Sequence, residues 1–471
     1  MSALAVVVDG ATGAAIPIHA VATAKLAEWQ ASRPAHDQAW LKAIEFKAES
    51  GSVAHLRDDH GQLSAVVVGL GKGDDPWACG GLAKQLPPGI YRLHEFVGCT
   101  DSLQASFPTW AAQAWALGAY AFKRYKKPDP DKDKPLAQLA WPEGCDRDGV
   151  TRTINAAALA RDLINTPAAD MLPDRLAEAV RSVGREFGAT ITEIIGDELL
   201  TQNYPAIHAV GRASSVAPRL IDLTWGRADH PKVTLVGKGV CFDSGGLDIK
   251  PSSGMALMKK DMGGAAILLG LAQMIMAAKL PVRLRLLVPA VENAVAGNAF
   301  RPGDVLASRK GLNIEIGNTD AEGRLILADA LAEAVTEKPT LLIDAATLTG
   351  AARTALGPEL PALFTDDEAL ASDLMAASRA TFDPLWRLPL WAPYRKMIDS
   401  KVADINNAGE SPFAGAITAA LFLKDFVGEG VAWAHLDVFA WNPADKPGRP
   451  QGGEAMTQRA LFGMIAKRFA T

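Results

Sequence analysis

Short apolar runs alternate with longer segments of helical spacing along the whole chain. The runs have the length and β-branched content of buried strands, and each precedes a loop and then a segment in which apolar residues recur every three or four positions. This alternation predicts an α/β fold with mostly parallel sheets. The clearest predicted strands are residues 65–68, 233–236, 283–288, 314–316 and 341–343.

Two helical segments carry further information. Residues 151–165 place Ile154, Leu163 and Ile164 at helical spacing, which predicts a helix joining an N-terminal region to the rest of the chain. Residues 263–278 are nearly uncharged but shorter than the roughly 20 residues that a spanning helix needs. We therefore expect a buried core helix there and no membrane span.

The length of 471 residues exceeds what one ordinary core accommodates, so two domains are expected. Residues 123–135 are rich in charge and proline, which predicts an exposed loop near the boundary. We predict a smaller N-terminal α/β domain over residues 1–145 and a linker helix over 146–165. The remainder, 166–471, is predicted to be a larger α/β domain with a central mixed sheet flanked by helices.

Charge and cysteine content narrow the class of protein. Apolar residues make up 49% of the chain and the net charge is −5, so no overall positive field exists to attract nucleic acid or an anionic membrane. The four cysteines form no CxxC pair, and the N-terminus lacks the basic region of a signal peptide. These features predict a cytoplasmic protein.

Two segments carry the candidate chemistry. The first runs from Gly237 to Pro251 and continues at Met258 to Gly264; the second is Asn318 to Arg324. Each begins where a predicted strand ends, which is where ligand-binding loops collect in open α/β sheets. Their glycines allow sharp turns and a close approach of the backbone to a bound group.

Four acids stand in these segments: Asp243, Asp261, Asp320 and Glu322. Any one alone is best interpreted as an exposed loop carboxylate. If the set converges, its members repel one another unless cations neutralise them. Oxygen-rich sets of this kind suit two divalent ions, which can clamp the attacking and departing oxygens of a hydrolytic reaction. Spacing alone does not show that the four acids converge.

The two segments resemble the leucyl aminopeptidase family of dinuclear metallopeptidases, also called cytosol aminopeptidases. The resemblance rests on Gly-Lys-Gly-x-x-Phe-Asp-Ser-Gly-Gly at 237–246, Leu-Asp-Ile-Lys-Pro-Ser at 247–252, Met-Lys-Lys-Asp-Met-Gly-Gly-Ala-Ala at 258–266 and Asn-Thr-Asp-Ala-Glu-Gly-Arg-Leu at 318–325. It implies that the larger domain is catalytic. The chain departs from the family pattern at residues 452–457, a loop that helps to shape the family's side-chain pocket.

The resemblance assigns roles to individual residues. It implies one divalent ion held by Lys238, Asp243, Asp261 and Glu322, and a second held by Asp243, Asp320 and Glu322. It further implies zinc or manganese, with magnesium also accepted, and a bicarbonate ion on Arg324 as general base. The implied catalytic residues are Lys250 and Arg324, and the implied substrate-binding residues are Met258, Thr347, Leu348 and Gly350.

The resemblance also implies a function and an assembly. The expected activity is removal of N-terminal residues, preferably leucine-like and apolar, from peptides with a free amine. A homohexamer is the expected assembly. Two alternatives were weighed: an additional DNA-binding regulatory role, which the nearly balanced charge of residues 1–145 does not support, and a dinuclear phosphoesterase, for which Lys238 would be a foreign ligand.

Overall fold

The computed structural model of the chain describes residues 3–10, 15–129, 133–409 and 411–469. It divides into two compact units, one comprising Met1–Ala158 with Pro443–Gln451 and the other Leu159–Asn442 with Gly452–Thr471. Helix α6 (Arg147–Asn165) is shared between them. It begins four residues before the segment of helical spacing at 151–165 and one residue after the start of the predicted linker helix, 146–165. The predicted domain limits at 145 and 165 stay a prediction.

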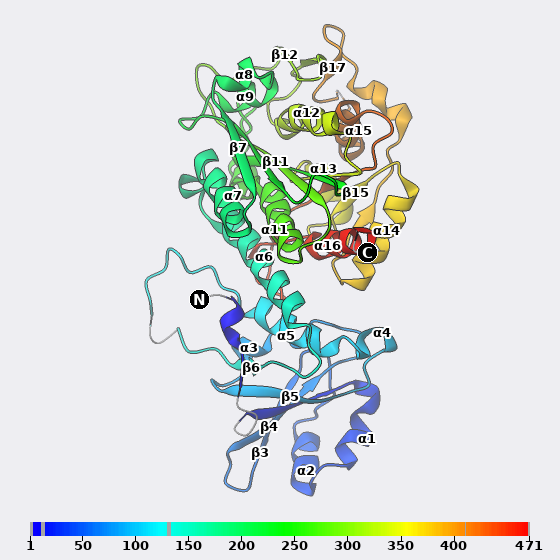
Figure 1. Cartoon of the computed structure of the whole chain (residues 1–471). Coiled ribbons are helices and arrows are strands. Elements are labelled where there is room, and N and C mark those ends of the chain that lie inside the picture. The colour runs from blue at the N-terminus through cyan, green and yellow to red at the C-terminus, as the bar shows by residue number, and fades with distance from the viewer. Residues whose placement is uncertain (1–2, 11–14, 130–132, 410, 470–471) are drawn as a thin grey trace. The chain divides into compact units, whose positions relative to one another are not determined.

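The N-terminal unit is a sheet between helices (Figure 1). Its described strands pair in parallel, except for an antiparallel β3–β4 edge. Trp29 and Leu41 pack on the sheet from the first two helices, and Trp115 packs near Tyr91 from α5. In sheet order the strands are β1 (Val7–Val8), β6 (Gln138–Ala140), β5 (Ile90–Val97), β2 (Ile16–Val21), β4 (Leu63–Gly69) and β3 (Val53–Arg57); the helices are α1 (Leu26–Ala31), α2 (Ala35–Ala43), α3 (Leu82–Gln85), α4 (Asp101–Gln104) and α5 (Phe107–Ala119).

The larger unit is built on a nine-stranded mixed sheet of described residues, which confirms the predicted fold class. Its centre, from β18 through β14 and β9 to β11, is parallel, and β8 and β7 continue it antiparallel. In order the strands are β16 (Trp386–Arg387), β15 (Ala362–Phe364), β18 (Trp433–Asp437), β14 (Leu341–Ala346), β9 (Lys232–Gly237), β11 (Arg283–Asn293), β8 (Arg219–Trp225) and β7 (Thr190–Ile195), with β10 (Gly239–Asp243) beside the end of β11.

Helices cover both faces of this sheet (Figure 1). On one face α9, α12 and α15 bury a core with Leu287, Leu342 and Trp433. On the other, α11 contacts β9, β14, α7 and α16. The helices are α7 (Pro173–Phe187), α8 (Glu198–Thr201), α9 (Pro205–Gly211), α10 (Ser252–Met255), α11 (Gly263–Ala277), α12 (Gly323–Ala334), α13 (Gly350–Leu356), α14 (Glu368–Ala380), α15 (Gly415–Val427) and α16 (Gln458–Phe469).

The hydrophobic pattern located most of the central elements. The predicted strands at 65–68, 233–236, 283–288 and 341–343 lie within β4, β9, β11 and β14. Helix α11 coincides with the predicted core helix and is buried almost throughout. Every residue of β14 is buried, because a central parallel strand is covered on both faces.

One predicted strand has a different place in the fold. Residues 314–316 overlap β13 (Asn313–Glu315), which lies outside the central sheet. It pairs with β12 (Val305–Ala307) and β17 (Ile405–Asn406) in a small sheet, and a second small sheet joins β19 (Trp441–Asn442) to β20 (Gly452–Gly453). A three-residue run does not reveal its pairing partner, because pairing depends on segments far along the chain.

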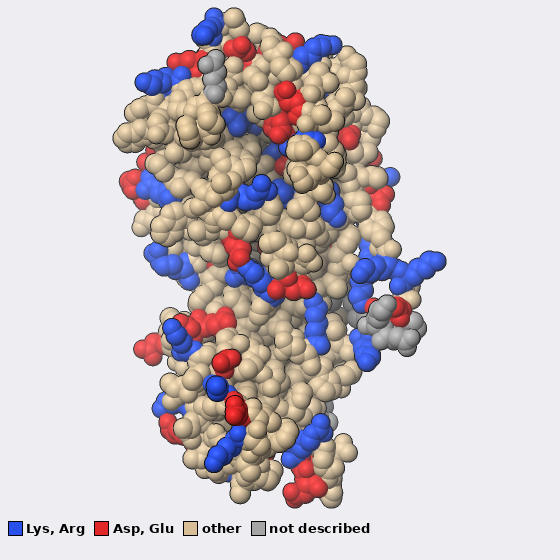
Figure 2. Space-filling model, turned by 180° about the vertical axis from the view of Figure 1, so that it is seen from behind, with Lys and Arg blue, Asp and Glu red and all other residues tan. Residues whose placement is uncertain are grey.

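The surface agrees with the charge analysis. On the face shown in Figure 2, basic and acidic side chains are interspersed. The described part of the predicted loop 123–135 contains no helix or strand, and residues 130–132 lie outside the described residues. Within the described chain, no helix is both long and apolar enough to cross a bilayer.

Helix α11 approaches the central sheet so closely that only glycine fits at its start. A Cβ on Gly264 would lie 2.0 Å from the carbonyl oxygen of Ala345 in β14. A real side chain there must push the helix away from the strand, because the obstacle is backbone and cannot rotate aside.

We therefore expect Gly264→Ala to lower the free energy of unfolding by about 1–3 kcal/mol, measured by urea denaturation. The matched control is Gly297→Ala, because that exposed position has ordinary φ and open space around its Cβ. The control should stay within about 0.5 kcal/mol of wild type. Equal stability of the two variants would contradict the tight contact.

Candidate metal centre

The candidate residues gather at the carboxyl ends of the central parallel strands. Lys238 follows β9, Asp243 ends β10, and Thr347 follows β14. Asp320 and Glu322 lie in the loop that leads into α12, and Asp261 lies two residues before the start of α11. Loops from several strands meet at this edge because parallel strands end there together.

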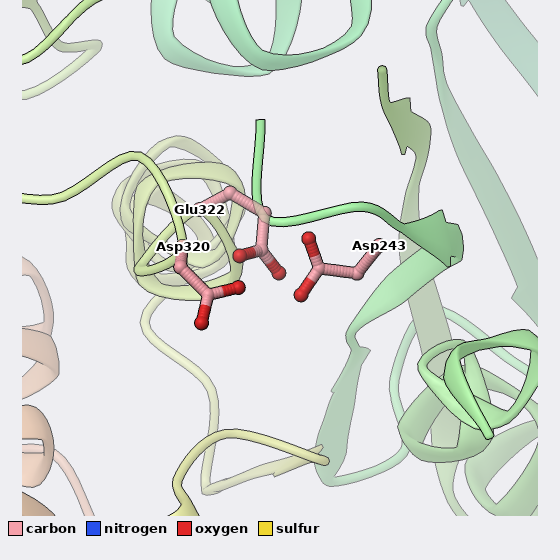
Figure 3. Close-up of side chains that lie close together, drawn as sticks. All are labelled: Asp243, Asp320 and Glu322. Atoms are coloured by element: carbon pink, nitrogen blue, oxygen red, sulfur yellow. The ribbon is translucent and has the colours of Figure 1, made fainter. Parts of the chain in front are cut away.

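Three of the four acids form one cluster. Ligand oxygens of Asp243, Asp320 and Glu322 all lie within 4.8 Å of one another, and Figure 3 shows the carboxylates pointing toward one another. These are the three acids that the family resemblance assigns to one ion. The fourth acid, Asp261, reaches the cluster through Lys238, whose Nζ lies 2.7 Å from Asp261 Oδ2 and 3.0 Å from Glu322 Oε1.

Lys238 is buried at the centre of the charged groups. Its Nζ donates a hydrogen bond to the carbonyl oxygen of Thr347 at 2.9 Å. Burial by itself would lower the pKa of Lys238, but the carboxylates around it, Asp261 first, raise that pKa well above its ordinary value. Gly323 makes room for the side chain, since a Cβ there would lie 2.5 Å from Lys238 Cε.

Crowding raises the pKa of two acids. Burial and then the neighbouring Asp243 raise the pKa of Asp320 to about 6. The same two causes raise the pKa of Glu322 well above its ordinary value. Carboxylates so placed keep their protons to a higher pH than usual unless more positive charge is supplied.

The donor set therefore suits divalent cations. Asp261 Oδ2 and Glu322 Oε1 are buried, and each lies beside the Lys238 ammonium group at the distances given above. Carboxylate oxygens with free lone pairs in a buried, electron-rich space are good ligands for hard and borderline divalent ions.

Lys250 and Arg324 differ in their access to the site. Lys250 Nζ lies 2.8 Å from Asp243 Oδ2 and also contacts Asp320, and Lys250 lines a cavity of about 450 Å³. Arg324 lies outside the set of described residues that line the cavity. Its Nη1 donates to the carbonyl oxygen of Asn407 at 2.7 Å, and its buried Nε has no partner among the described residues.

The predicted substrate-binding residues all line this cavity. Met258, Thr347, Leu348 and Gly350 lie in its wall, together with the acids Asp243, Asp261 and Asp320. The hydroxyl of Thr347 also donates to Asp261 Oδ1 at 2.7 Å. The structure therefore brings the candidate ligands and the candidate substrate contacts into one space.

Two asparagines that the sequence analysis missed organise the acids. Asn293, at the end of β11, donates from Nδ2 to Asp243 Oδ1 at 2.9 Å and to the carbonyl oxygen of Thr319 at 3.1 Å. Asn407 donates to the carbonyl oxygens of Asn318 and Ala321. A polar residue at the carboxyl end of a predicted strand could have indicated Asn293, whereas nothing in the local sequence marks Asn407.

The two loops are tied together by Thr319 and Asp248. The hydroxyl of the fully buried Thr319 donates to the carbonyl oxygen of Gly245 at 2.6 Å and accepts from the Asp248 backbone N–H at 2.8 Å. Asp248 Oδ2 accepts from the Thr319 backbone N–H at 2.7 Å. Gly245 and Gly246 have φ of 88° and 66°, so glycine is needed for the turn that follows Asp243.

Comparison with known proteins agrees with this geometry. The sequence model of the cytosol aminopeptidase family, catalytic domain, matches residues 158–462, and that of the M17 aminopeptidase N-terminal domain matches residues 16–142. The chain belongs to the cytosol aminopeptidase family. It is therefore a peptidase, and its membership supports aminopeptidase activity on peptides. The family prediction is confirmed, and neither the DNA-binding nor the phosphoesterase alternative is favoured.

Relatives in the cytosol aminopeptidase family match most of the chain. A probable cytosol aminopeptidase of Geotalea uraniireducens is 38% identical over 440 residues, covering 88% of each chain. That of Roseiflexus castenholzii is 44% identical over 363 residues, 74% of this chain and 73% of the relative. A crystal structure of cytosol aminopeptidase from Coxiella burnetii superposes with a TM-score of 0.93 at 51% identity, covering 99% of this chain and 100% of that one.

A further solved structure carries a metal. The bottromycin maturation enzyme BotP, in complex with Mn, has a TM-score of 0.85 and 34% identity, covering 97% of this chain and 100% of its own. Together with the buried acidic cluster, this neighbour indicates divalent metal binding in the present chain.

We expect Thr319→Val to lower the free energy of unfolding by about 1–3 kcal/mol, because the shape is kept while buried hydrogen bonds are lost. Chemical denaturation provides the measurement. The control is Thr336→Val, whose exposed hydroxyl donates only to the nearby carbonyl oxygen of Glu333. Thr319→Val as stable as the control would mean that the two loops do not depend on this hydroxyl.

Proposed function

We propose that the chain is a two-metal aminopeptidase that removes leucine-like, apolar residues from peptides with a free N-terminus. The observation that carries the proposal is the convergence of three buried carboxylates, the half-buried Asp320 and Lys238 beside a cavity. Two divalent ions, zinc or manganese with magnesium as a third candidate, would lower the pKa of a water molecule and polarise the peptide carbonyl. The first would be held by Lys238, Asp243, Asp261 and Glu322, and the second by Asp243, Asp320 and Glu322.

The net formal charge of the metal-loaded site would be positive, which favours binding of an anion beside the ions. Four carboxylates and two divalent ions cancel, and Lys238 would be neutral as a metal ligand, so protonated Lys250 and Arg324 leave two formal positive charges. Burial lowers the pKa of Arg324 only to about 10, so its guanidinium stays charged at neutral pH. Its unpartnered Nε retains a donor for an anion, which supports the proposed bicarbonate ion acting as general base.

Lys250 is proposed to stabilise the negative charge that develops on the peptide carbonyl oxygen during hydrolysis. Its ammonium group lines the cavity, and although burial opposes its charge, Asp243 raises its pKa above the ordinary value. A preorganised cation in a partly buried site stabilises an oxyanion more than water does. Met258, Thr347, Leu348 and Gly350 are proposed to contact the substrate from the cavity wall.

Two further expectations belong to this proposal. A homohexamer would cover large apolar side chains that the single chain leaves exposed, among them Trp391, Val402 and Phe413. A cytoplasmic location likewise stays a prediction.

The activity is tested with leucine amide and a leucine-starting peptide. Release of leucine should be lost after removal of metal with a chelator and should return when zinc or manganese is added. The same peptide with an acetylated N-terminus should react about 100-fold more slowly or worse, because a blocked amine cannot position the first residue. Equal cleavage of both peptides would contradict the mechanism, and hydrolysis of a simple phosphate ester alone would favour the phosphoesterase.

The ligand role of Lys238 has a separate test. An ammonium group cannot coordinate a cation, so metal binding must displace the Lys238 proton, whereas arginine stays protonated. We expect Lys238→Arg to retain one tight metal per chain after dialysis and wild type to retain two, measured by elemental analysis. Lys250→Arg is the matched control and should retain both, because Lys250 is proposed to stay charged. Two metals in folded Lys238→Arg would remove Lys238 from the ligands.

A further inference from the structure

One wall of the cavity carries two cations that the proposed chemistry does not use. Lys260 and Arg353 both line the cavity and both lie over the ring of Phe439. Lys260 Nζ is 4.7 Å from the ring centroid, and Arg353 Cζ is 5.1 Å from it. Two positive groups thus lie against one aromatic ring in the wall of the cavity, which Thr347, Leu348 and Gly350 also line.

Lys260 is the more unusual of the two. Only 5% of it is exposed, and its ammonium group forms no hydrogen bond or ion pair with any described residue. The contact with Phe439 is a cation–π interaction, which attracts the charge but accepts none of its three N–H donors in the manner of an oxygen. A buried ammonium group without such an acceptor is costly, so an anion in the cavity would gain by accepting its hydrogen bonds.

The acids nearest to Lys260 are already engaged. Asp261 binds the hydroxyl of Thr347 through Oδ1 and faces Lys238 through Oδ2. Asp437 accepts hydrogen bonds from the backbone N–H groups of Leu348 at 3.0 Å and Thr349 at 3.2 Å, and from the Thr349 hydroxyl at 2.6 Å. Neither acid forms an ion pair with Lys260, so the anion must come from outside this wall.

We propose that Lys260, with Arg353 beside it, binds a carboxylate of the substrate, and that this carboxylate is the side chain of an N-terminal glutamate or aspartate. The inference rests on the proposed function. Lys260 is adjacent to Asp261, and Thr347 contacts both that acid and the cavity, so Lys260 lies on the wall nearest to the first residue of a substrate anchored at the metal centre. The enzyme would therefore release acidic as well as apolar residues.

The apolar part of the same wall agrees with this selectivity. Met258, Leu348 and Phe439 provide surface for the methylene groups of a side chain, while Lys260 meets its charged end. Glutamine has nearly the shape of glutamate without the charge, so comparing the two isolates the contribution of the cation. A charge-assisted hydrogen bond in a desolvated pocket is expected to favour glutamate over glutamine about tenfold or more.

The test uses the metal-loaded full chain and amide substrates with N-terminal Leu, Gln, Glu and Asp. We expect wild type to show a higher kcat/KM for Glu than for Gln, by about tenfold. Lys260→Met should abolish this preference, with the Leu substrate as the internal reference for each variant. Lys259→Met is the matched control: Lys259 Nζ donates to the carbonyl oxygen of Asn165 at 2.7 Å, and Lys259 is not among the described residues lining the cavity. The control should keep the wild-type ratio.

A second arm separates the two possible sources of the carboxylate. The dipeptide Leu-Gly has a C-terminal carboxylate and its amide, Leu-Gly-NH2, does not. If Lys260→Met lowers the dipeptide-to-amide ratio and leaves the Glu-to-Gln ratio unchanged, Lys260 binds the C-terminus and the assignment to the side chain is overturned.

The wild-type values alone separate the two proposals. Leu release with equal kcat/KM for Glu and Gln overturns this inference and leaves the proposed function intact. No release of Leu by the metal-loaded enzyme overturns the proposed function itself, and this inference with it. Because these outcomes need no variant, a Lys260 substitution that fails to fold does not affect them.

Discussion

Mutual repulsion among buried carboxylates is the constraint on which the rest of the larger unit depends. Asp243, Asp320 and Glu322 lie within a few ångströms of one another, and Asp261 joins them across Lys238. Such a group is stable only beside positive charge. Lysines from two different loops, Lys238 and Lys250, supply part of that charge, and the carboxylate set is suited to bind a divalent ion as well.

These charged groups can lie together only because the backbone segments that carry them approach one another closely. Strands β9 and β14 end side by side, and the start of α11 reaches β14 only because Gly264 has no side chain. Gly323 leaves space for Lys238 in the same way. The polar links from Asn293, Thr319 and Asn407 then orient the acids and their loops. The glycines therefore allow the backbone segments to approach one another, and the buried hydrogen bonds keep the carboxylates in place.

Cations are distributed unevenly around the cavity, and their partners distinguish them. Lys238 and Lys250 contact the acids directly, whereas Arg324 is not among the described residues that line the cavity, and its Nη1 donates to a backbone carbonyl oxygen. Lys260 lies over an aromatic ring and, within the described chain, forms no ion pair with an acid. Basic residues near the site thus contact acids, a backbone carbonyl oxygen or an aromatic ring according to their loop. The family resemblance assigned roles to Lys238, Lys250 and Arg324 and none to Lys260.

The sequence by itself determined the fold class, the central strands and the family. Buried parallel strands are continuous apolar runs, so β9, β11 and β14 were visible without a structure, and α11 was visible as an uncharged helical segment. The motif segments also supplied all five proposed ligands. Only the tertiary structure decided that the four acids converge, that β13 belongs to a separate sheet, that Asn407 supports the loop before α12, and that Lys260 has no acidic partner. These are contacts between residues far apart in sequence, and local pattern carries no information about which distant groups a folded chain brings together.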